Sequence, residues 1–120
     1  MDTPKIFESE YRFCQILWDH EPVGSTELVR LCRERLGWKK STTYTVIKRL
    51  GERGVVRMEN SVVTSLVSRD QVRRSESREL IDRAFDGSLP QFIAAFTSGK
   101  ALTEQEVSEI RRLIDGYAGD

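Results

Sequence analysis

The sequence predicts a mainly α-helical protein with a small β-wing: a winged helix-turn-helix domain over residues 1–67, then an α-helical dimerisation domain over residues 68–120. Three observations support this fold class. Apolar residues recur at helical spacing in three segments before residue 54. β-Branched residues then flank a short polar turn, as in a hairpin. After residue 68, amphipathic segments resume between helix-breaking residues.

The first two helices are bounded by clear start and stop signals. The first is expected from about Glu8 to His20, with His20 capping its end and Pro22 stopping the chain from continuing. The second begins near Gly24 or Ser25, with Glu27 in a capping-box position three residues after Gly24, and ends at Gly37. Their predicted core residues are Phe13, Cys14, Ile16, Leu17 and Trp18, and then Leu28, Val29, Cys32 and Leu36.

The most informative stretch is WKKSTTYTVIKRLGERGVV, residues 38–56. Ser41 is a predicted N-cap and Gly54 a predicted helix stop. One side of this third helix carries Thr43, Val46, Ile47 and Leu50, and the other carries Ser41, Tyr44, Thr45, Lys48 and Arg49. Hydroxyls and arginine can reach base edges, while lysine and arginine neutralise phosphates. The pattern is therefore typical of a recognition helix for the DNA major groove.

Residues 55–67, VVRMENSVVTSLV, predict two short strands around a turn at Glu59, Asn60 and Ser61. An ordinary hairpin of an α+β domain has the same pattern. Because this hairpin follows a basic third helix directly, a wing beside a recognition helix is favoured.

Charge is distributed unevenly although 19 basic and 19 acidic residues balance overall. Between Arg30 and Arg57 there are nine basic residues against Glu34 and Glu52, a local balance of +7, whereas the chain from Ser68 onward carries −2. Such a run is most often a solvated helix face, so charge alone does not establish DNA binding. The contrast indicates that the basic first part and the mildly acidic second part have different functions.

Three short helices are expected after Ser68, which is a predicted cap, with breaks at Gly87 and Pro90 and a capping box at Thr103 and Glu106. About fifty residues cannot bury their apolar stripes unaided. They pack either on the first domain or on a second copy. The second option is favoured, because a two-fold dimer matches a palindromic DNA site. The predicted dimerisation residues are Leu80, Ile81, Phe85, Phe92, Phe96, Val107, Ile110, Leu113 and Ile114.

Other function classes find little support. Cys14, Cys32 and the single His20 are too dispersed for a zinc site, so two reduced core cysteines are expected, with a regulatory disulfide or a soft-metal site as the alternative. No glycine-rich phosphate loop or catalytic set is visible, so we expect no enzyme, no cofactor, no metal and no small-molecule ligand. The N-terminus lacks a signal peptide, and the longest uncharged run, Ser88 to Gly99, is too short to span a bilayer, which predicts a cytoplasmic protein.

The layout resembles the penicillinase-repressor family, which comprises winged-helix repressors of β-lactamase and methicillin-resistance genes and their copper-responsive relatives. The segments that carry the resemblance are ILWDHEP (16–22), TELVRLCRERLGW (26–38), TTYTVIKRLGERGVV (42–56) and LTEQEVSEIRRLI (102–114). The family pattern T-V-x-T-L-L-x-R-L-x-x-K-G appears here as TTYTVIKRLGERG.

The resemblance implies a homodimeric repressor on a double-stranded DNA operator, an inverted repeat often with TACA-type half-sites. Its implied base contacts are Ser41, Thr42, Tyr44, Thr45 and Arg49. The cations assigned to phosphates are Lys39, Lys40, Lys48, Arg53 and Arg57. Tyr44 stands where the family usually has a long polar or basic side chain, so a partly buried ring against the wing is its alternative role. Solubility is the alternative role of the cations.

The sequence departs from the family pattern in four further features. The wing lacks the usual Gly-Arg tip, and Phe7 replaces a Ser or Thr helix cap. In β-lactam-responsive members a membrane sensor protease cuts an Asn-Phe bond. The nearest match here is Ala95-Phe96, with Ala in place of Asn. The C-terminal cysteines of copper-responsive members are absent from this sequence. A winged-helix protein-interaction module, with the basic face docking an acidic partner, is the competing hypothesis.

Overall fold

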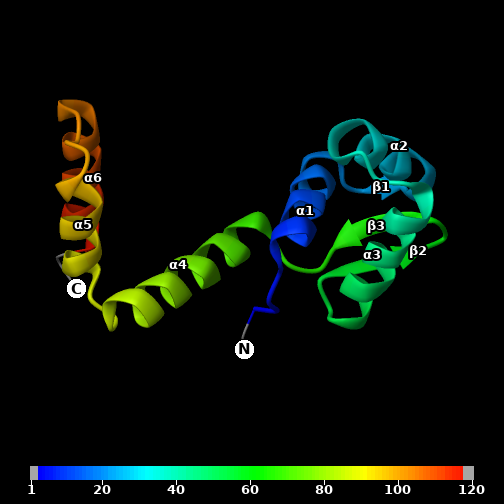
Figure 1. The fold of residues 1–120 in the computed structure, drawn as a ribbon, viewed down its shortest axis with the longest axis horizontal. Coiled ribbons are helices and arrows are strands. Elements are labelled where there is room, and N and C mark those ends of the chain that lie inside the picture. The colour runs from blue at the N-terminus through cyan, green and yellow to red at the C-terminus, as the bar shows by residue number, and fades with distance from the viewer. Residues whose placement is uncertain (1–2, 118–120) are drawn as a thin grey trace. The chain divides into compact units, whose positions relative to one another are not determined.

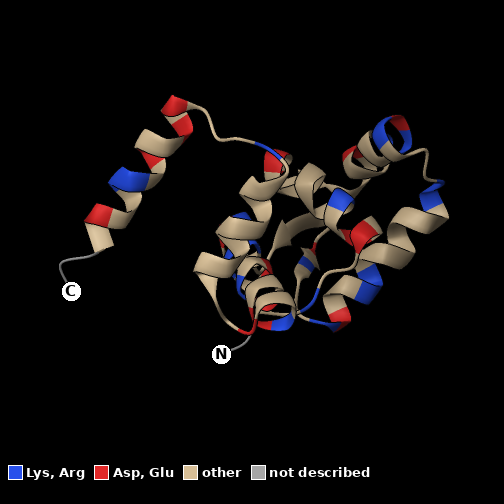
Figure 2. Ribbon diagram, turned by 60° about the vertical axis from the view of Figure 1, so that its left-hand side comes forward, with Lys and Arg blue, Asp and Glu red and all other residues tan. Residues whose placement is uncertain are grey.

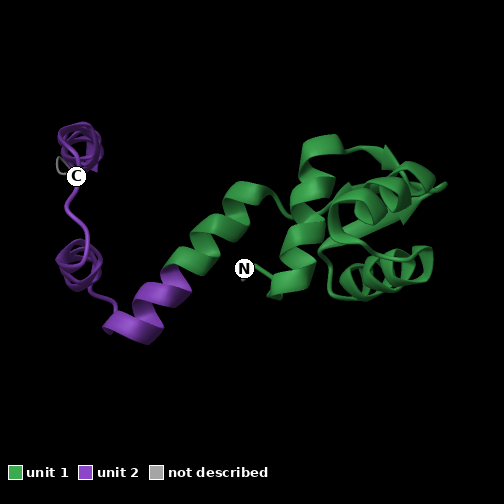
Figure 3. Ribbon diagram, turned by 45° about the horizontal axis from the view of Figure 1, so that its top comes forward, with its two compact units in different colours: residues 1–77 green, residues 78–120 purple. Residues whose placement is uncertain are grey.

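The computed structural model describes residues 3–117, drawn in Figure 1. The chain divides into two compact units, Met1–Ser77 and Arg78–Asp120, coloured separately in Figure 3. The expected boundary lay at residues 67–68. The start of the fourth helix belongs to the first unit, where Val72 is buried in the core.

The first unit is a three-helix domain with a small antiparallel sheet, which confirms the predicted fold class (Figure 1). Its elements are α1 (Glu8–His20), β1 (Val23–Gly24), α2 (Ser25–Leu36), α3 (Lys40–Glu52), β2 (Val56–Glu59), β3 (Val62–Ser65) and the first part of α4 (Arg69–Phe85). The strand order is β1-β3-β2, so β3 is central. The two-residue strand β1 was not predicted from the sequence.

The hairpin forms as expected. Glu59 pairs with Val62 across the turn, and Val56 pairs with Ser65 at the open end. Asn60 and Ser61 form the turn, with φ of 52° and 63°. Two positive φ values match the twist of a two-residue hairpin connection. The amide of Ser25 donates to the carbonyl of Ser61 at 2.7 Å, which ties the wing tip to the start of α2.

The core lies where α1, α2, α3 and the sheet meet. Its fully buried side chains include Phe13, Leu17, Leu28, Leu50, Val55, Val56, Val63 and Val72. These come from the apolar stripes that the sequence predicted. Trp38, in the link before α3, stacks on Phe13 with ring centroids 6.1 Å apart. This contact sets where α3 begins relative to α1.

Two predicted helix caps are wrong. Helix α3 begins at Lys40 with Lys39 as its N-cap, so Ser41 lies inside the first turn and makes no cap hydrogen bond. Glu27 does not complete a capping box at α2, because its carboxylate pairs with Arg30 one turn along the helix. Other predicted ends are confirmed: Gly37 and Gly54 adopt the left-handed conformation that ends a helix.

Helix α1 ends as predicted. It runs from Glu8 to His20, and Nδ1 of His20 lies 2.8 Å from the carbonyl oxygen of Ile16. The side chain of His20 thus adds a second polar contact to a carbonyl in the last turn of α1. Phe7, the N-cap residue, has no side-chain cap bond, but its amide donates to Glu10.

The start of α4 is attached to α1 by polar contacts. Ser68 and Gln71 form a reciprocal capping box, as the sequence predicted for Ser68. The guanidinium of Arg69 binds the carboxylate of Asp19 at 2.7 Å and lies over the ring of Trp18. The indole of Trp18 donates to the carbonyl of Val67 at 3.0 Å. These contacts add the first turns of α4 to the first unit.

The second unit contains the end of α4, α5 (Leu89–Ser98) and α6 (Glu104–Tyr117). The predicted capping box of Thr103 and Glu106 forms at the start of α6, and Ser88 caps α5, a cap that was not predicted from the sequence. Phe92 packs against Phe85 and Phe96, with ring centroids 5.5 and 6.0 Å apart. Within residues 78–117, no side chain is fully buried by the single chain.

Both cysteines are free and buried, as expected for reduced core residues. Burial raises the pKa of Cys14 to about 12, and it also raises the pKa of Cys32. A thiol in this environment has little thiolate at neutral pH and behaves as a small hydrophobe. No helix within residues 3–117 is both long and apolar enough to cross a membrane.

We expect both thiols of the native protein to resist a thiol-specific reagent at neutral pH, because each is buried and protonated. Labelling with a chromogenic disulfide reagent measures this directly. In guanidinium chloride both thiols should react fully. In buffer the labelling rate should equal the rate at which the protein unfolds. Fast labelling of the native protein would contradict the assignment of both residues to the core.

Candidate nucleic-acid interface

The outer face of α3 is exposed along its length. Ser41, Thr45 and Lys48 lie along its centre, opposite the buried residues Thr43 and Leu50. Thr42 is exposed on one flank, and Lys39 and Lys40 are exposed at the start of the helix. The side chains at the centre combine hydroxyls with a cation. They therefore offer both hydrogen-bonding groups and positive charge to a ligand of this face.

Tyr44 occupies a different environment. Its ring is half-buried against the core, and its hydroxyl donates to Oγ of the buried Ser25 at 3.0 Å. Tyr44 also lines a hollow between α3 and β2 together with Ile47, Lys48, Gly51, Val56, Arg57 and Met58. The ring is thus partly buried beside the wing and links α3 to α2, while Lys48 and Arg57 stand at the edge of the hollow.

Arg49 and Arg53 meet a carboxylate from another helix. Nε of Arg49 donates to Glu10 Oε2 at 3.1 Å. Arg53 binds the same carboxylate with two nitrogens, at 2.8 and 3.0 Å, and also donates to the carbonyl of Lys5. We call Glu10, Arg49 and Arg53 the Glu10 cluster. It joins the second half of α3 to the beginning of α1.

The members of the Glu10 cluster differ in exposure. The side chain of Glu10 is 3% exposed, that of Arg53 30% and that of Arg49 51%. Burial opposes ionisation of Glu10, but hydrogen bonds from Arg53 and the Phe7 amide, with the charges of Arg53 and Arg49, hold its pKa below the usual value. The carboxylate is therefore ionised at neutral pH.

The sequence interpretation missed Glu10. The available signal was its position: Glu10, Phe13, Cys14 and Leu17 follow the spacing of one helix face, so a carboxylate lies on the apolar stripe of α1. A charge on a buried stripe requires a partner. The sequence does not show that the partners come from the far end of α3.

The wing carries few cations. Arg57 lies on β2 and its guanidinium is 3.8 Å from the carboxylate of Glu59, with both side chains exposed. Met58 and Val62 are exposed apolar residues on the two strands. The turn itself is formed by Asn60 and Ser61, so this wing has no basic side chain at its tip.

The second unit exposes a broad apolar surface. Leu80, Leu89, Ile93, Phe96, Leu113, Ile114 and Tyr117 are each more than a third exposed. Among the predicted dimerisation residues, Leu80, Phe96, Leu113 and Ile114 are exposed, and Ile81, Phe85, Phe92, Val107 and Ile110 are half-buried. Large apolar side chains exposed in this number are typical of an interaction site.

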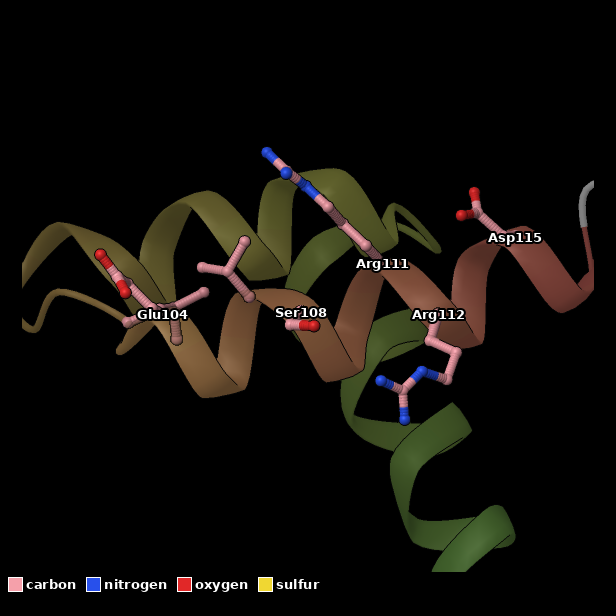
Figure 4. A pocket seen from close by; sticks show the side chains of 7 residues that line it. Glu104, Ser108, Arg111, Arg112 and Asp115 are labelled. Atoms are coloured by element: carbon pink, nitrogen blue, oxygen red, sulfur yellow. The ribbon is translucent and has the colours of Figure 1, made fainter.

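Charged residues also occur along α6: Glu104, Glu106, Glu109 and Asp115 are acidic, and Arg111 and Arg112 are basic. Figure 2 shows red and blue segments along the helix that leads to the C-terminus. A hollow beside this helix is lined by Leu102, Glu104, Val107, Ser108, Arg111, Arg112 and Asp115. Its labelled side chains extend in different directions and do not converge on one point (Figure 4). Within the described residues, His, Cys, Asp and Glu also form no group of three that could hold a metal ion.

Three helices followed by a two-stranded wing, with an exposed polar face on the third helix, define a winged helix-turn-helix protein of the type that regulates transcription. The chain belongs to the penicillinase repressor family, whose model matches residues 6–116. Members of this family are regulators rather than enzymes, and membership supports a transcriptional repressor.

Two curated relatives match nearly the whole chain. The penicillinase repressor of Bacillus licheniformis is 19% identical over 118 residues, which cover 95% of this chain and 92% of the relative. An uncharacterized 16.5 kDa protein in the ptsI 3′ region of Latilactobacillus sakei is 23% identical over 121 residues, covering 98% of this chain and 83% of the relative. The similarity thus spans both units.

The Glu10 cluster should make folding stability sensitive to acid. The pKa of Glu10 is lowered in the folded protein, so its stabilising effect is present above the unfolded-state pKa of about 4.3 and is lost as pH falls through the folded value. Glu10→Gln should reduce the free energy of unfolding at pH 7 and should lose less of it on acidification. Urea denaturation at pH 7 and below pH 4 measures both effects.

Glu8→Gln is the matched control, because it removes an exposed carboxylate from the same helix. It should behave like the wild-type protein at both pH values. Equal acid sensitivity of the wild-type and Glu10→Gln proteins would show that Glu10 does not contribute to the pH dependence.

Proposed function

We propose that this protein is a sequence-specific DNA-binding transcriptional repressor that acts in the cytoplasm as a homodimer on an inverted-repeat operator. The observation that carries the proposal is the outer face of α3, which presents Ser41, Thr45 and Lys48 from a helix packed firmly on α1, α2 and the wing. Residues on a rigid helix can enter the major groove without losing much conformational freedom.

The proposed contacts follow from the exposed groups of the first unit. Ser41, Thr42 and Thr45 carry hydroxyls that can reach base edges. Lys39, Lys40, Lys48 and Arg57 are exposed cations near the same face and are assigned to phosphates. Tyr44 and Arg53 use their polar groups within the fold, so their main effect on DNA binding is to hold α3 in place.

The dimer is proposed from the apolar surface of the second unit. Leu113, Ile114 and Tyr117 are 64%, 57% and 77% exposed on α6. Burying one such side chain is worth roughly 1.5–3 kcal/mol, which a second copy supplies by covering the same surface in return. The amphipathic character of α6 favours a partner of equal apolarity, and the family relation to a repressor favours a second copy of this chain.

A dimer of this kind places two recognition helices in successive major grooves, about 34 Å apart along the DNA. Each half-site contact alone is weak, and tethering the two raises the effective concentration of the second contact. Occupancy of a promoter would block transcription, and loss of the dimer would release it. Proteolysis by a sensor protease is one route to that loss.

Cleavage at Ala95-Phe96 has a structural requirement. The bond lies inside α5, where the side chains of both residues are exposed. A protease binds an extended backbone, so α5 has to unwind locally before this bond is cut. We therefore propose that any cleavage at this position follows local opening of the second unit.

Selection from a randomised pool of duplexes tests the proposal, with stoichiometry measured by light scattering. An enriched inverted repeat bound by two chains supports the dimeric repressor. No enrichment, together with no salt-dependent affinity for random duplex, would overturn it in favour of a winged-helix module that docks an acidic protein partner.

Two substitutions on α3 should separate base reading from phosphate binding. Thr45→Ala should weaken binding to the selected duplex by about 1–3 kcal/mol and relax the preference at one base position. Lys48→Ala should weaken binding to selected and random duplexes by the same factor and reduce the salt dependence. Fluorescence anisotropy titrations at several salt concentrations measure both, and reversed behaviour of the two variants would contradict the assignment.

A charge placed on the apolar face of α6 should dissociate the dimer. Leu113→Glu introduces a carboxylate where the proposed interface buries an apolar side chain, so the variant should be monomeric and bind the selected duplex far more weakly. Ser108→Glu is the control, since Ser108 is exposed and the helical repeat places it on a different face of α6 from Leu113. Sedimentation velocity measures the oligomeric state. A Leu113→Glu dimer, or an equal effect of both variants, would sink the proposed interface.

A further inference from the structure

The Glu10 cluster leaves part of Arg49 free. Only Nε of Arg49 bonds to Glu10, and within residues 3–117 its two terminal amino groups have no hydrogen-bond partner. The guanidinium is half-exposed, at 51%, whereas the carboxylate beneath it is almost completely buried. Glu10 therefore fixes Arg49 through Nε, while the two terminal amino groups remain available to a ligand.

We infer that Glu10 is a positioning residue for DNA binding: it holds Nε of Arg49 so that the two terminal amino groups form a fork for one phosphate of the DNA backbone. This inference rests on the proposed DNA-binding function. It assigns Arg49 to a phosphate rather than to a base edge, and it gives a role to a residue of α1 that lies outside the recognition helix.

The position of Arg49 on α3 favours a phosphate. At 3.6 residues per turn, Ser41, Thr45 and Lys48 follow the centre of the exposed face, and Arg49 lies on the flank toward α1. A side chain on that flank, tied to another helix, stands at the rim of a groove when the centre of α3 enters it. The sugar-phosphate backbone forms that rim, and two parallel N–H groups match its phosphate oxygens.

The charge of the cluster also fits an anion. Two guanidiniums share one carboxylate, so the Glu10 cluster carries a net charge of +1. Arg53 provides the bidentate partner that a buried carboxylate needs, with the amide of Phe7 as a further donor. Glu10 is thus satisfied without the full guanidinium of Arg49, which keeps a positive charge available to a ligand.

Holding Arg49 in advance lowers the cost of binding. A free arginine loses much of its rotamer freedom when it is fixed on a phosphate, about 0.5–1.5 kcal/mol for a long side chain at an interface, which corresponds to roughly two- to tenfold in affinity. In this protein the ion pair with Glu10 has already restricted the side chain. The opposite role, in which Glu10 withholds Arg49 from DNA, predicts the opposite sign for the effect of removing Glu10.

The test is a double-mutant cycle of Glu10→Gln and Arg49→Ala in the full-length chain. Affinity for the selected duplex and for a random duplex of equal length is measured across a range of salt concentrations, with folding checked by circular dichroism. Arg49→Ala should lower the slope of log K against log salt by about 0.9, the value for one phosphate, and weaken both duplexes equally. Glu10→Gln should weaken binding about two- to tenfold more when Arg49 is present than in the Arg49→Ala background, where the variant loses only the contact with Arg53 that positions α3.

Two further variants keep the test decisive. Arg49→Lys leaves the contacts between Glu10 and Arg53 intact, retains the charge and lacks the fork, so it should preserve the salt slope and lose affinity. Arg12→Ala is the control, because it removes an exposed cation of α1 that pairs with Glu8, and it should bind like the wild-type protein.

The outcomes separate the two proposals. An unchanged salt slope in Arg49→Ala, a loss confined to the selected duplex, tighter binding by Glu10→Gln, or an equal effect of Glu10→Gln in both backgrounds would overturn the positioning role alone. A wild-type protein without salt-dependent DNA affinity would overturn the proposed function as well.

Discussion

Burial of the Glu10 carboxylate is the constraint on which the geometry of the first unit depends. A carboxylate that is 3% exposed has to be paired, and the partners it finds are two arginines near the end of α3 and the amide that precedes α1. Apolar packing alone permits small shifts of one helix on another, because it has no direction. The bidentate contact of Arg53 with Glu10 is directional, so it fixes the second half of α3 against α1.

The first half of α3 is held by different contacts. Trp38 stacks on Phe13 just before the helix begins, and Tyr44 reaches across to Ser25 at the start of α2. The amide of Ser25 also bonds to the wing tip at Ser61. The helix is thereby fixed on both flanks, and within residues 3–117 its outer line of Ser41, Thr45 and Lys48 is exposed and makes no hydrogen bond or ion pair through its side chains. A surface that is rigid and unoccupied is suited to recognition of a partner.

The two units solve the problem of burial in different ways. The first closes a core of its own, with Phe13, Leu28 and Val63 completely excluded from solvent. The second leaves large apolar residues of α5 and α6 exposed, because three short helices enclose too little volume. The stability of the second unit is therefore expected to depend on a partner surface. In a homodimer the partner is a second copy of the chain, so this stability should rise with protein concentration.

Much of this architecture followed from local pattern. Helix α1 and the caps at Ser68 and Thr103 were predicted correctly, because apolar spacing and turn chemistry act over a few residues. The hairpin turn was also predicted, although Glu59, which was expected in it, is the last residue of β2 and only Asn60 and Ser61 form the turn. The predicted cap at Ser41 and capping box at Glu27 were wrong for local reasons. Helix α3 begins one residue before Ser41, and the carboxylate of Glu27 pairs with Arg30 instead of an amide at the helix start. Strand β1 was missed because two residues, Val23 and Gly24, carry no periodicity, and only pairing with β3 defines them.

The sequence by itself determined the fold class, the family, the polar face of α3 and the apolar stripes of the last helices, since each is encoded by residues that are close in the chain. Only the tertiary structure decided what Tyr44, Arg49 and Arg53 do. Their polar groups look equivalent along α3, but Ser25 and Glu10 come from other helices and engage them. Contacts between residues 19 to 43 positions apart depend on how the helices pack, and sequence spacing does not specify that packing.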